Sequence, residues 1–252
     1  MSQKPEVVST IKRSQGVVSS LLLTEYSVAV VAIAFKSNQL TGEISLIGLQ
    51  SPALRNPVVF DVYKNPKLYM EGQLHRIFQA EKLIKIVHDC RSFCAQLKKL
   101  YYITSHSMFD TQVAYTLQME ENNLPPRLIS YENLHKNIVG LQIGTRFSYV
   151  KGLEKSDGNL WNKRPLPDEL LWALTEELNS LHNSVYPLMF RSITEGNVEE
   201  FELRCGLAAR GMSRTGTGRV QTRSGRVATS TTPLLTINAM QAELLPNTKP
   251  IT

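Results

Sequence analysis

Two carboxylates in this chain, Asp89 and Asp110, stand where a divalent metal ion could be bound. Each ends a short apolar segment typical of a buried strand, and each precedes a stretch with helical spacing. Carboxylate oxygens are the ligands that Mg²⁺ prefers, so one hypothesis is a metal site that uses this pair. A carboxylate between a strand and a helix can also cap the free N–H groups of the helix. We favour capping for both residues, and a hydrogen-bonded core position for the neighbouring His88.

The three cysteines, Cys90, Cys94 and Cys205, are too few and too scattered for a disulfide framework. Cys90 and Cys94 are four residues apart and can share a helix face, but no second Cys or His pair follows at the spacing of a zinc site. The chain also has no Ser-His-Asp set and no glycine-rich phosphate loop that opens a helix. We therefore expect buried thiols in a reducing compartment, with no metal ion and no other cofactor.

Apolar runs separated by turn residues predict the elements that would position these side chains. Three adjacent strands come first, joined by short loops, as in an antiparallel meander. A helix ending near Glu81, a strand, a second helix and a short strand follow, and this alternation implies parallel crossovers. The predicted strands are 28–35, 43–50, 58–63, 83–87 and 108–109.

The second half of the chain has helical spacing. Helices are predicted at 113–120 and 131–139, and a long one runs from about 167 to 193 with acidic residues in its first turn. Apolar side chains three and four residues apart give this last helix one continuous face, which core packing explains better than a cofactor site. The order of elements predicts an α/β protein of ribonuclease H-like architecture, with a mixed central sheet flanked by helices and a helical C-terminal part.

Three segments resemble the motifs of 3′-5′ exonucleases of the ribonuclease D type. They are Lys-Ile-Val-His-Asp-Cys-Arg at 85–91, Phe-Asp-Thr-Gln-Val-Ala at 109–114 and Trp-Asn-Lys-Arg-Pro-Leu at 161–166. The first two look most like the exonuclease domain-containing family of piRNA biogenesis, which is related to the mRNA-transport adaptor Egalitarian. The resemblance covers about residues 28–195 and implies the 3′-5′ exonuclease fold. It also implies catalytic degeneracy, RNA binding, an adaptor role and self-association.

The resemblance implies that metal-binding carboxylates have been replaced in this chain. In the family, an Asp-x-Glu pair, an Asp of the second motif and an Asp of the third hold two metal ions, and a Tyr or His positions the attacking water. The carboxylate positions correspond here to Ala32, Ala34, Phe93 and Glu177, and the Tyr or His position to Ala173.

Shifting the alignment does not restore the first pair, because no Asp or Glu occurs between Ser27 and Gly42. A methyl group cannot bind Mg²⁺, and Phe93 is expected to fill part of the metal cavity. We therefore expect a protein that is not an enzyme.

The resulting hypothesis is a non-catalytic RNA-binding adaptor, acting in piRNA or other small-RNA biogenesis with single-stranded RNA as its partner. One alternative is an active metal-dependent exonuclease that uses Asp89, Asp110 and Glu177 as displaced ligands. The other is a scaffold or mRNA-transport adaptor that does not bind RNA. The expected protein partners are Tudor-domain or other small-RNA pathway proteins and a second copy of the chain.

The formal charge of +6 lies entirely in the C-terminal segment. Residues 204–252 carry seven Lys and Arg side chains against one acidic residue, so the rest of the chain has no net charge. Gly, Ser, Thr and Arg dominate after Gly206 without any aromatic residue, so we expect a disordered tail. Flexible arginines can follow phosphates, and arginine beside glycine can be methylated and bound by a Tudor domain, although a merely solubilising tail is an alternative. The candidate arginines are Arg210, Arg214, Arg219, Arg223 and Arg226.

On the folded body, Arg146 and Lys151 alternate with aromatic residues and could contact RNA bases and phosphates. The favoured interpretation is structural, a helix with Phe147 and Val150 packed inward.

The domain limits follow from these patterns: an N-terminal extension at 1–20, the degenerate exonuclease domain at 21–203 and the basic tail at 204–252. The apolar stretch 16–35 approaches the length of a membrane span, but polar residues interrupt it and its second half fits a buried strand. The first residues lack the layout of a signal peptide. We therefore expect no membrane contact and a cytoplasmic protein.

Overall fold

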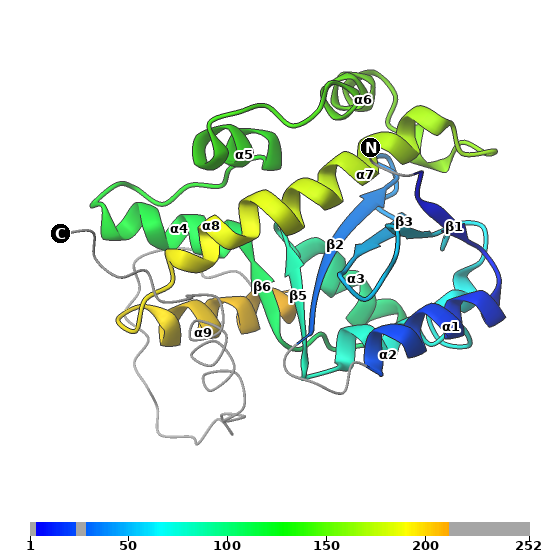
Figure 1. Ribbon diagram of the computed structural model, residues 1–252, viewed down its shortest axis with the longest axis horizontal. Helices are drawn as coiled ribbons and strands as arrows, with labels where there is room; N and C mark the ends of the chain where they lie inside the picture. The colour runs from blue at the N-terminus through cyan, green and yellow to red at the C-terminus, as the bar shows by residue number, and fades with distance from the viewer. Residues whose placement is uncertain (1–3, 24–28, 212–252) are drawn as a thin grey trace.

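The structure is a computed structural model that describes residues 4–23 and 29–211, which form a mixed α/β fold (Figure 1). A sheet at its centre has the strand order β1-β4-β3-β2-β5-β6. This confirms the predicted class, a mixed central sheet flanked by helices. The strands are β1 (Glu6–Val8), β2 (Ala29–Ser37), β3 (Ile44–Gln50), β4 (Val58–Phe60), β5 (Leu83–Val87) and β6 (Met108–Asp110).

Strand pairing follows the predicted order. β2, β3 and β4 are antiparallel neighbours, while β5 pairs parallel with β2 and β6 pairs parallel with β5. The strand predicted at 58–63 ends earlier, at Phe60, because Asp61 starts a turn in which its carboxylate accepts a hydrogen bond of 3.0 Å from the Lys64 N–H. β2 therefore lies between β3 and β5, in the middle of the sheet.

Helices cover both faces of the sheet. The segment predicted as one helix at 167–193 consists of α7, the π-helical turn η3 and α8 in succession. Pro187 lies in the first turn of α8 and has no N–H to donate, so a wider turn before it accommodates the missing bond. The helices are α1 (Ile11–Leu22), η1 (Pro66–Leu68), α2 (Leu74–Gln79), α3 (Arg91–Tyr101), α4 (Thr111–Glu121), α5 (Tyr131–Val139), α6 (Thr145–Ser156), η2 (Leu160–Asn162), α7 (Asp168–Ser180), η3 (Leu181–Val185), α8 (Tyr186–Arg191) and α9 (Val198–Ala209).

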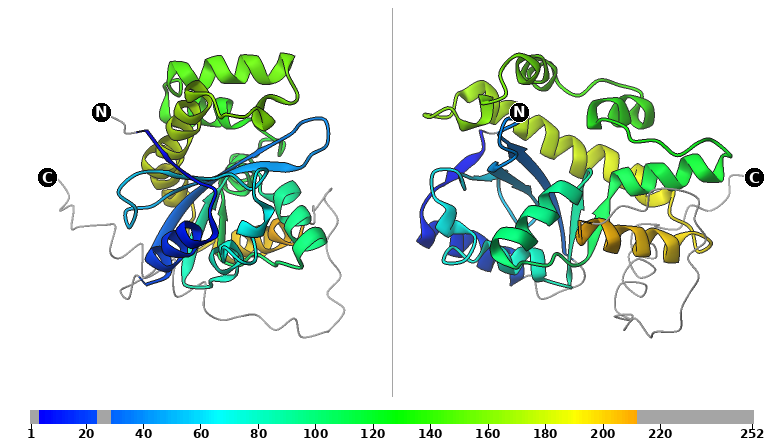
Figure 2. Two further views of the ribbon diagram at one scale, coloured as in Figure 1. Left: turned by 90° about the vertical axis from the view of Figure 1, so that its right-hand side faces the viewer. Right: turned by 180° about the vertical axis from the view of Figure 1, so that it is seen from behind.

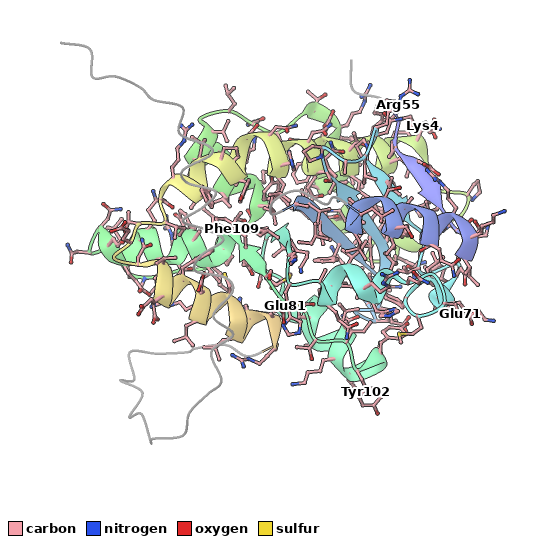
Figure 3. The ribbon with its side chains drawn as sticks, turned by 60° about the horizontal axis from the view of Figure 1, so that its bottom comes forward. Lys4, Arg55, Glu71, Glu81, Tyr102 and Phe109 are labelled. Atoms are coloured by element: carbon pink, nitrogen blue, oxygen red, sulfur yellow. The ribbon has the colours of Figure 1, made fainter. Side chains whose placement is uncertain are left out.

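The sheet separates two core layers, which Figure 2 shows with α6 and α7 on one side and α1 to α3 on the other. Side chains alternate along β2, so Ala32 and Ala34 face the layer beneath α7 while Val31 and Ile33 face the layer of α1 to α3. Phe109 lies in the interior near α9, and its ring centre is 4.9 Å from that of Phe201 (Figure 3).

Residues 6–22 are built into the domain, although an extension was expected at 1–20. β1 pairs parallel with β4, and Val8 is buried. α1 places Val17, Val18 and Leu21 in the second core layer, and it contacts α2. The domain therefore starts near Glu6, because β1 covers the edge of β4 and α1 has an apolar face to bury.

The C-terminal limit also differs from the expected boundary at 203. α9 continues to Ala209, and Ala208 and Ala209 are buried against the layer of α1 to α3. Gly211 follows with a φ of 71°, a conformation that favours glycine after a helix. The tail beyond Gly211 lies outside the described residues. Among the helices that the structure describes, none has both the length and the apolar composition needed to cross a bilayer.

Candidate functional site

Four residues that the sequence analysis aligned with the exonuclease motifs, two in a strand and two in a helix, come together on one face of the sheet. Ala32 and Ala34 point from β2 into the core layer that α7 covers, and α7 contacts both β2 and β3. Ala173 and Glu177 lie one turn apart on α7 and line a small cavity over the sheet. The tertiary structure thus places three methyl groups and one carboxylate in this region.

Lys36 extends into the same cavity. It lies two residues after Ala34 in β2 and therefore on the same face of the strand. Its ammonium group forms an ion pair with the carboxylate of Glu177, and these side chains are only 6% and 14% exposed. The ammonium nitrogen also lies 5.3 Å from the ring centre of Trp161. A cation that belongs to the chain thus occupies the space beside Glu177.

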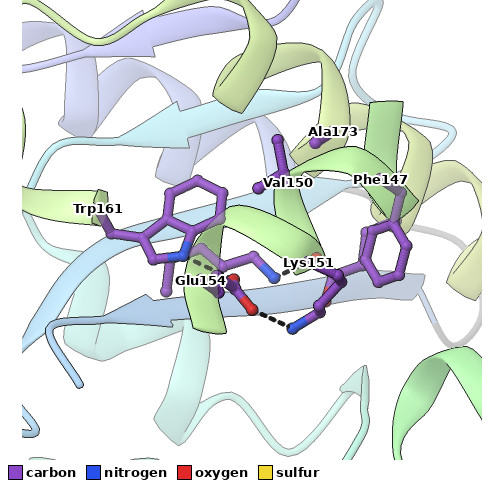
Figure 4. Close-up of a pocket in the computed structure, with 8 residues that line it drawn as sticks. Phe147, Val150, Lys151, Glu154, Trp161 and Ala173 are labelled. Carbon is purple, nitrogen blue, oxygen red and sulfur yellow. Dashed lines mark hydrogen bonds and ion pairs between the residues drawn. The ribbon is translucent and has the colours of Figure 1, made fainter. Parts of the chain in front are cut away.

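A second ion pair completes the cluster (Figure 4). The Lys151 ammonium donates a 2.6 Å hydrogen bond to Oε2 of Glu154, and Nε1 of Trp161 donates one of 2.7 Å to Oε1. Burial raises the pKa of Glu154, but the ammonium groups of Lys36 and Lys151 outweigh it and leave this pKa below its ordinary value. Burial likewise lowers the pKa of Lys151, whereas the carboxylates of Glu177 and Glu154 raise it further, above its ordinary value. Two lysines and two glutamates therefore neutralise one another.

These side chains fill the space between them and leave essentially no room for a water molecule. A nucleotide therefore does not fit there without rearrangement. The lining residues are Lys36, Phe147, Val150, Lys151, Glu154, Trp161, Ala173 and Glu177.

The residues present do not fit the two divalent ions that this fold would hold in an active nuclease. Glu177 is already paired with a lysine, and the alanines have no oxygen to offer. Lys36 and Lys151 would repel a divalent cation placed between them. Within the described ranges, no three or more His, Cys, Asp or Glu side chains form a group that could hold a metal ion.

Phe93 does not line this cavity, contrary to the expectation. It belongs to the other core layer, where its ring stacks on Phe35 with centres 3.3 Å apart and packs against Phe78. Counting along the second motif places Phe93 on α3, and this helix covers the face of the sheet opposite α7. The Phe93 side chain therefore fills the core on that face and does not reach the cavity.

The carboxylate of Asp110 has a structural role, as predicted. It is buried, caps α4 through a 2.9 Å hydrogen bond from the Gln112 N–H, and accepts two further bonds from the N–H groups of Asp89 and Cys90. The capping role predicted for Asp89 is wrong, because its side chain instead accepts a 2.9 Å bond from Nε of Arg91.

The expectations that His88 is hydrogen-bonded and that the cysteines are buried thiols are confirmed. The ring nitrogens of His88 contact Oγ1 of Thr111 at 3.0 Å and the Ile129 carbonyl at 2.9 Å, so this histidine is fully hydrogen-bonded. All three cysteines are buried and free of disulfides.

Of the two predicted RNA contacts on the folded body, Lys151 lies in the cavity and Arg146 lies on the surface. Phe147 and Val150 pack inward, as the structural interpretation of this segment requires. Lys151 is engaged by carboxylates in the cavity, whereas Arg146 is exposed with its guanidinium 5.0 Å from the ring centre of Trp172. Arg210 ends α9, and its Nε donates a 3.1 Å hydrogen bond to the Gly206 carbonyl. The other tail candidates, Arg214, Arg219, Arg223 and Arg226, lie outside the described residues.

Sequence reasoning did not identify Lys36, Glu154 or Trp161 as members of the site. The sequence did mark Lys36, because it is a charged residue in an apolar strand and lies on the same face of that strand as Ala32 and Ala34. No comparable signal marked Glu154, whose partners are brought to it by the packing of α6 against α7 and η2.

Comparison with known proteins gives relatives and a fold. No family model matches the chain. It is 28% identical over 153 residues to the Egalitarian protein homolog of Caenorhabditis elegans, which covers 58% of this chain and 26% of that protein. It is 27% identical over 189 residues to the piRNA biogenesis protein EXD1 of Mus musculus, which covers 71% of this chain and 33% of that protein. The chain thus spans about a quarter to a third of the length of these relatives, and the predicted resemblance is confirmed.

Solved structures show the same architecture. The RNase D of Escherichia coli, described as an exoribonuclease involved in structured RNA processing, matches with a TM-score of 0.64 and 13% identity, over 84% of this chain and 52% of that chain. The RNase D of Trypanosoma brucei matches with a TM-score of 0.61 and 18% identity, over 86% of this chain and 78% of that chain. The fold is therefore the predicted 3′-5′ exonuclease fold of the ribonuclease D type.

Proposed function

We propose that this relative of EXD1 and Egalitarian is a non-catalytic RNA-binding adaptor that acts in piRNA or other small-RNA biogenesis. The observation that carries the proposal is the ion pair between Lys36 and Glu177. An active site of this fold needs converging negative charge to retain two divalent ions. Here the only glutamate at the motif positions is neutralised by a lysine of the chain's own central strand.

The geometry also argues against displaced metal ligands. Both carboxylate oxygens of Asp110 accept backbone hydrogen bonds, and Asp89 is paired with Arg91. A metal ion bound to Asp110 would have to displace N–H groups that hold the start of α3 and α4. Such an exchange is costly for a buried carboxylate.

The pathway and the ligand are inferred from the relatives and from charge. The curated relatives include piRNA biogenesis proteins, and the T. brucei RNase D structure has also been solved in complex with the RNA U12. In our proposal, the arginines from Arg210 to Arg226 add sequence-independent contacts to phosphates and a site for methylation and Tudor-domain binding. The proposal places the protein in the cytoplasm, where two copies associate.

The decisive experiment incubates the purified protein with 5′-labelled single-stranded RNA in Mg²⁺ and, separately, in Mn²⁺. We expect an RNA complex without any shortening of the strand. Two variants, Asp89→Asn and Glu177→Gln, serve as controls. Shortening that disappears in either variant would overturn the proposal in favour of displaced ligands. Shortening that persists in both indicates a contaminating nuclease, and the measurement is then repeated after further purification.

Binding itself is tested by measuring RNA affinity at two salt concentrations, with and without residues 212–252. Removal of the tail is expected to weaken binding and to flatten its salt dependence, because each lost phosphate contact lowers the slope by about 0.7 for a single strand. Absence of binding by both forms would favour a scaffold that does not bind RNA.

A further inference from the structure

The outward side of α6 carries a ridge of four exposed residues: Arg146, Tyr149, Gly152 and Lys155. They are three residues apart, so they form a row that winds around the helix, with Tyr149 and Gly152 at its middle and Arg146 and Lys155 on opposite edges of the exposed face. The opposite side of α6 faces α7 and the cavity, where Phe147, Val150 and Glu154 are buried. The inner side of α6 therefore covers the cavity, and the ridge faces solvent.

Charge on the ridge is positive and available. The guanidinium of Arg146 rests 5.0 Å from the ring centre of Trp172, which holds it in place without neutralising it. Lys155 has no ion-pair partner in the part of the chain that the structure describes. Glu154 is the acidic residue of α6, and it is buried and paired with Lys151.

Gly152 lies between these cations, and the fold does not require a glycine there. A Cβ at this position would meet no atom within 4 Å, and its φ is not positive. Glycine inside an exposed helix costs about 1 kcal/mol relative to alanine. Gly152 therefore lowers the stability of the helix, and neither packing nor backbone conformation requires it. We attribute a glycine at such a position to function. A bare backbone at this point lets a ligand approach the helix closely.

Single-stranded nucleic acid matches this row of groups. Tyr149 is 60% exposed and offers a ring on which a base can stack, and Arg146 and Lys155 flank it with positive charge. From the rise and the number of residues per turn, the two cations are separated by about 13.5 Å along the helix axis and lie on opposite edges of its exposed face, so they would contact two phosphates separated by at least one nucleotide in a strand laid across Gly152. The ridge has no exposed aliphatic side chain, which a protein-binding helix face would present.

We infer that the α6 ridge is a contact site for single-stranded RNA, in which Tyr149 stacks on a base and the strand passes over Gly152 between two phosphate-binding cations. This inference rests on the proposed RNA binding and locates it on the folded body, separate from the tail.

The test uses the full-length chain in which Arg214, Arg219, Arg223 and Arg226 are changed to Gln, so that the charged tail does not mask the body. Affinity for fluorescein-labelled oligouridine is measured by anisotropy, and the melting temperature is measured in parallel. Two variants, Tyr149→Ala and Gly152→Leu, probe the ridge. The matched control is Gly16→Leu, at an exposed glycine of α1 where a Cβ would meet only the flexible end of Arg13, at 3.8 Å.

We expect Tyr149→Ala to weaken binding by about tenfold, from the usual strength of base stacking. Gly152→Leu should weaken binding by about fivefold or more while the melting temperature rises, because leucine favours a helix more than glycine does. Gly16→Leu should raise the melting temperature and leave RNA affinity unchanged. Weaker binding by a more stable protein cannot be explained by unfolding.

Different failures identify different errors. If the tail-substituted chain with an intact ridge binds RNA and both ridge variants bind equally well, the ridge inference is overturned and the proposed function stands. No binding by the tail-substituted chain with an intact ridge would overturn the ridge inference, and no binding by the wild-type chain would overturn the proposed function as well. Ridge variants that disrupt self-association in sedimentation but keep their RNA affinity would assign the ridge to a protein contact, and they would overturn the inference as well.

Discussion

Lys36 and Glu177 are partners that cannot be separated without cost. Both side chains are nearly buried, and each charge is stabilised mainly by the other and by the neighbouring pair of Lys151 and Glu154. A buried ion pair often stabilises a protein no more than two apolar side chains of similar volume would. Removing one partner alone, however, leaves the other charge buried and unpaired. Once both residues are present, the loss of either one is therefore destabilising, and the pair keeps the cavity occupied.

Replacing Lys36 alone tests this. Lys36→Met should lower the free energy of unfolding by about 3–5 kcal/mol, because it leaves Glu177 buried without its cation. The double variant Lys36→Met/Glu177→Leu should recover most of that loss, since it removes both charges. Urea denaturation measures all three proteins. A single variant as stable as the wild type would show that solvent already screens the pair.

The lowered pKa of Glu154 makes part of the stability depend on pH. A carboxylate whose pKa is below its ordinary value of 4.5 when folded stabilises the protein above that pH, and this contribution is lost as the pH falls through the folded pKa. The difference in unfolding free energy between wild type and Glu154→Gln should therefore be largest near pH 7 and shrink in acid. Denaturation at a series of pH values measures it, and a difference that is constant down to pH 3 would contradict it.

α6 is attached to α7 by a contact at its first turn. Oε2 of Glu176 on α7 accepts a 2.9 Å hydrogen bond from the N–H of Phe147, one of the donors that a helix start leaves free. Gly144 precedes α6 at the point where a side chain would overlap the carboxylate of Glu176. The absence of a side chain there lets one helix cap the other and fixes the inner face of α6 over the cavity.

Gly144→Ala should break this cap. The new methyl group displaces the Glu176 carboxylate from the Phe147 N–H, and loss of a helix cap costs about 1 kcal/mol. Gly16→Ala in α1 is the control, because a Cβ there would meet only the flexible end of Arg13, at 3.8 Å, and alanine should stabilise the helix. Thermal unfolding should shift in opposite directions for the two variants. Equal shifts would mean that Glu176 relocates freely.

The whole domain depends on its first elements. β1 covers the edge of β4, and α1 closes the core layer on the side opposite α7. If this segment were an extension, changes in it would not affect the stability of the domain. The structure instead places β1 in the sheet and the apolar face of α1 in the core.

Val18→Ala separates these alternatives. Val18 is fully buried, so removing two carbons should cost about 2 kcal/mol from lost burial and the cavity left behind. Lys12→Ala, at an exposed position of the same helix, should change stability by less than about 0.5 kcal/mol. Chemical denaturation compares the two, and equal effects would indicate that α1 is detached from the core in solution.

Local patterns were sufficient to predict much of the fold. β5 and α5 have the limits that hydrophobic periodicity predicted, and the three-strand meander was identified because its turns carry turn-forming residues. β1 escaped detection because three residues are too few to show an alternation. The helical pattern of α1 merges in the sequence with the apolar residues of β2, which masks both limits.

Ala32, Ala34 and Ala173, which offer neither a carboxylate nor a Tyr or His side chain, can be read directly from the amino-acid order, because residue types need no coordinates. Only the packing of the folded chain shows which side chains occupy the space around these alanines. Lys36 and Glu177 are 141 residues apart, so whether they pair depends on how α7 crosses the sheet. Phe93 likewise lies in the other core layer because α3 covers the face of the sheet opposite α7. The residue types at the motif positions are determined by the sequence itself. The pairing of buried charges depends on the tertiary structure, because it arises only when distant elements exclude water between them.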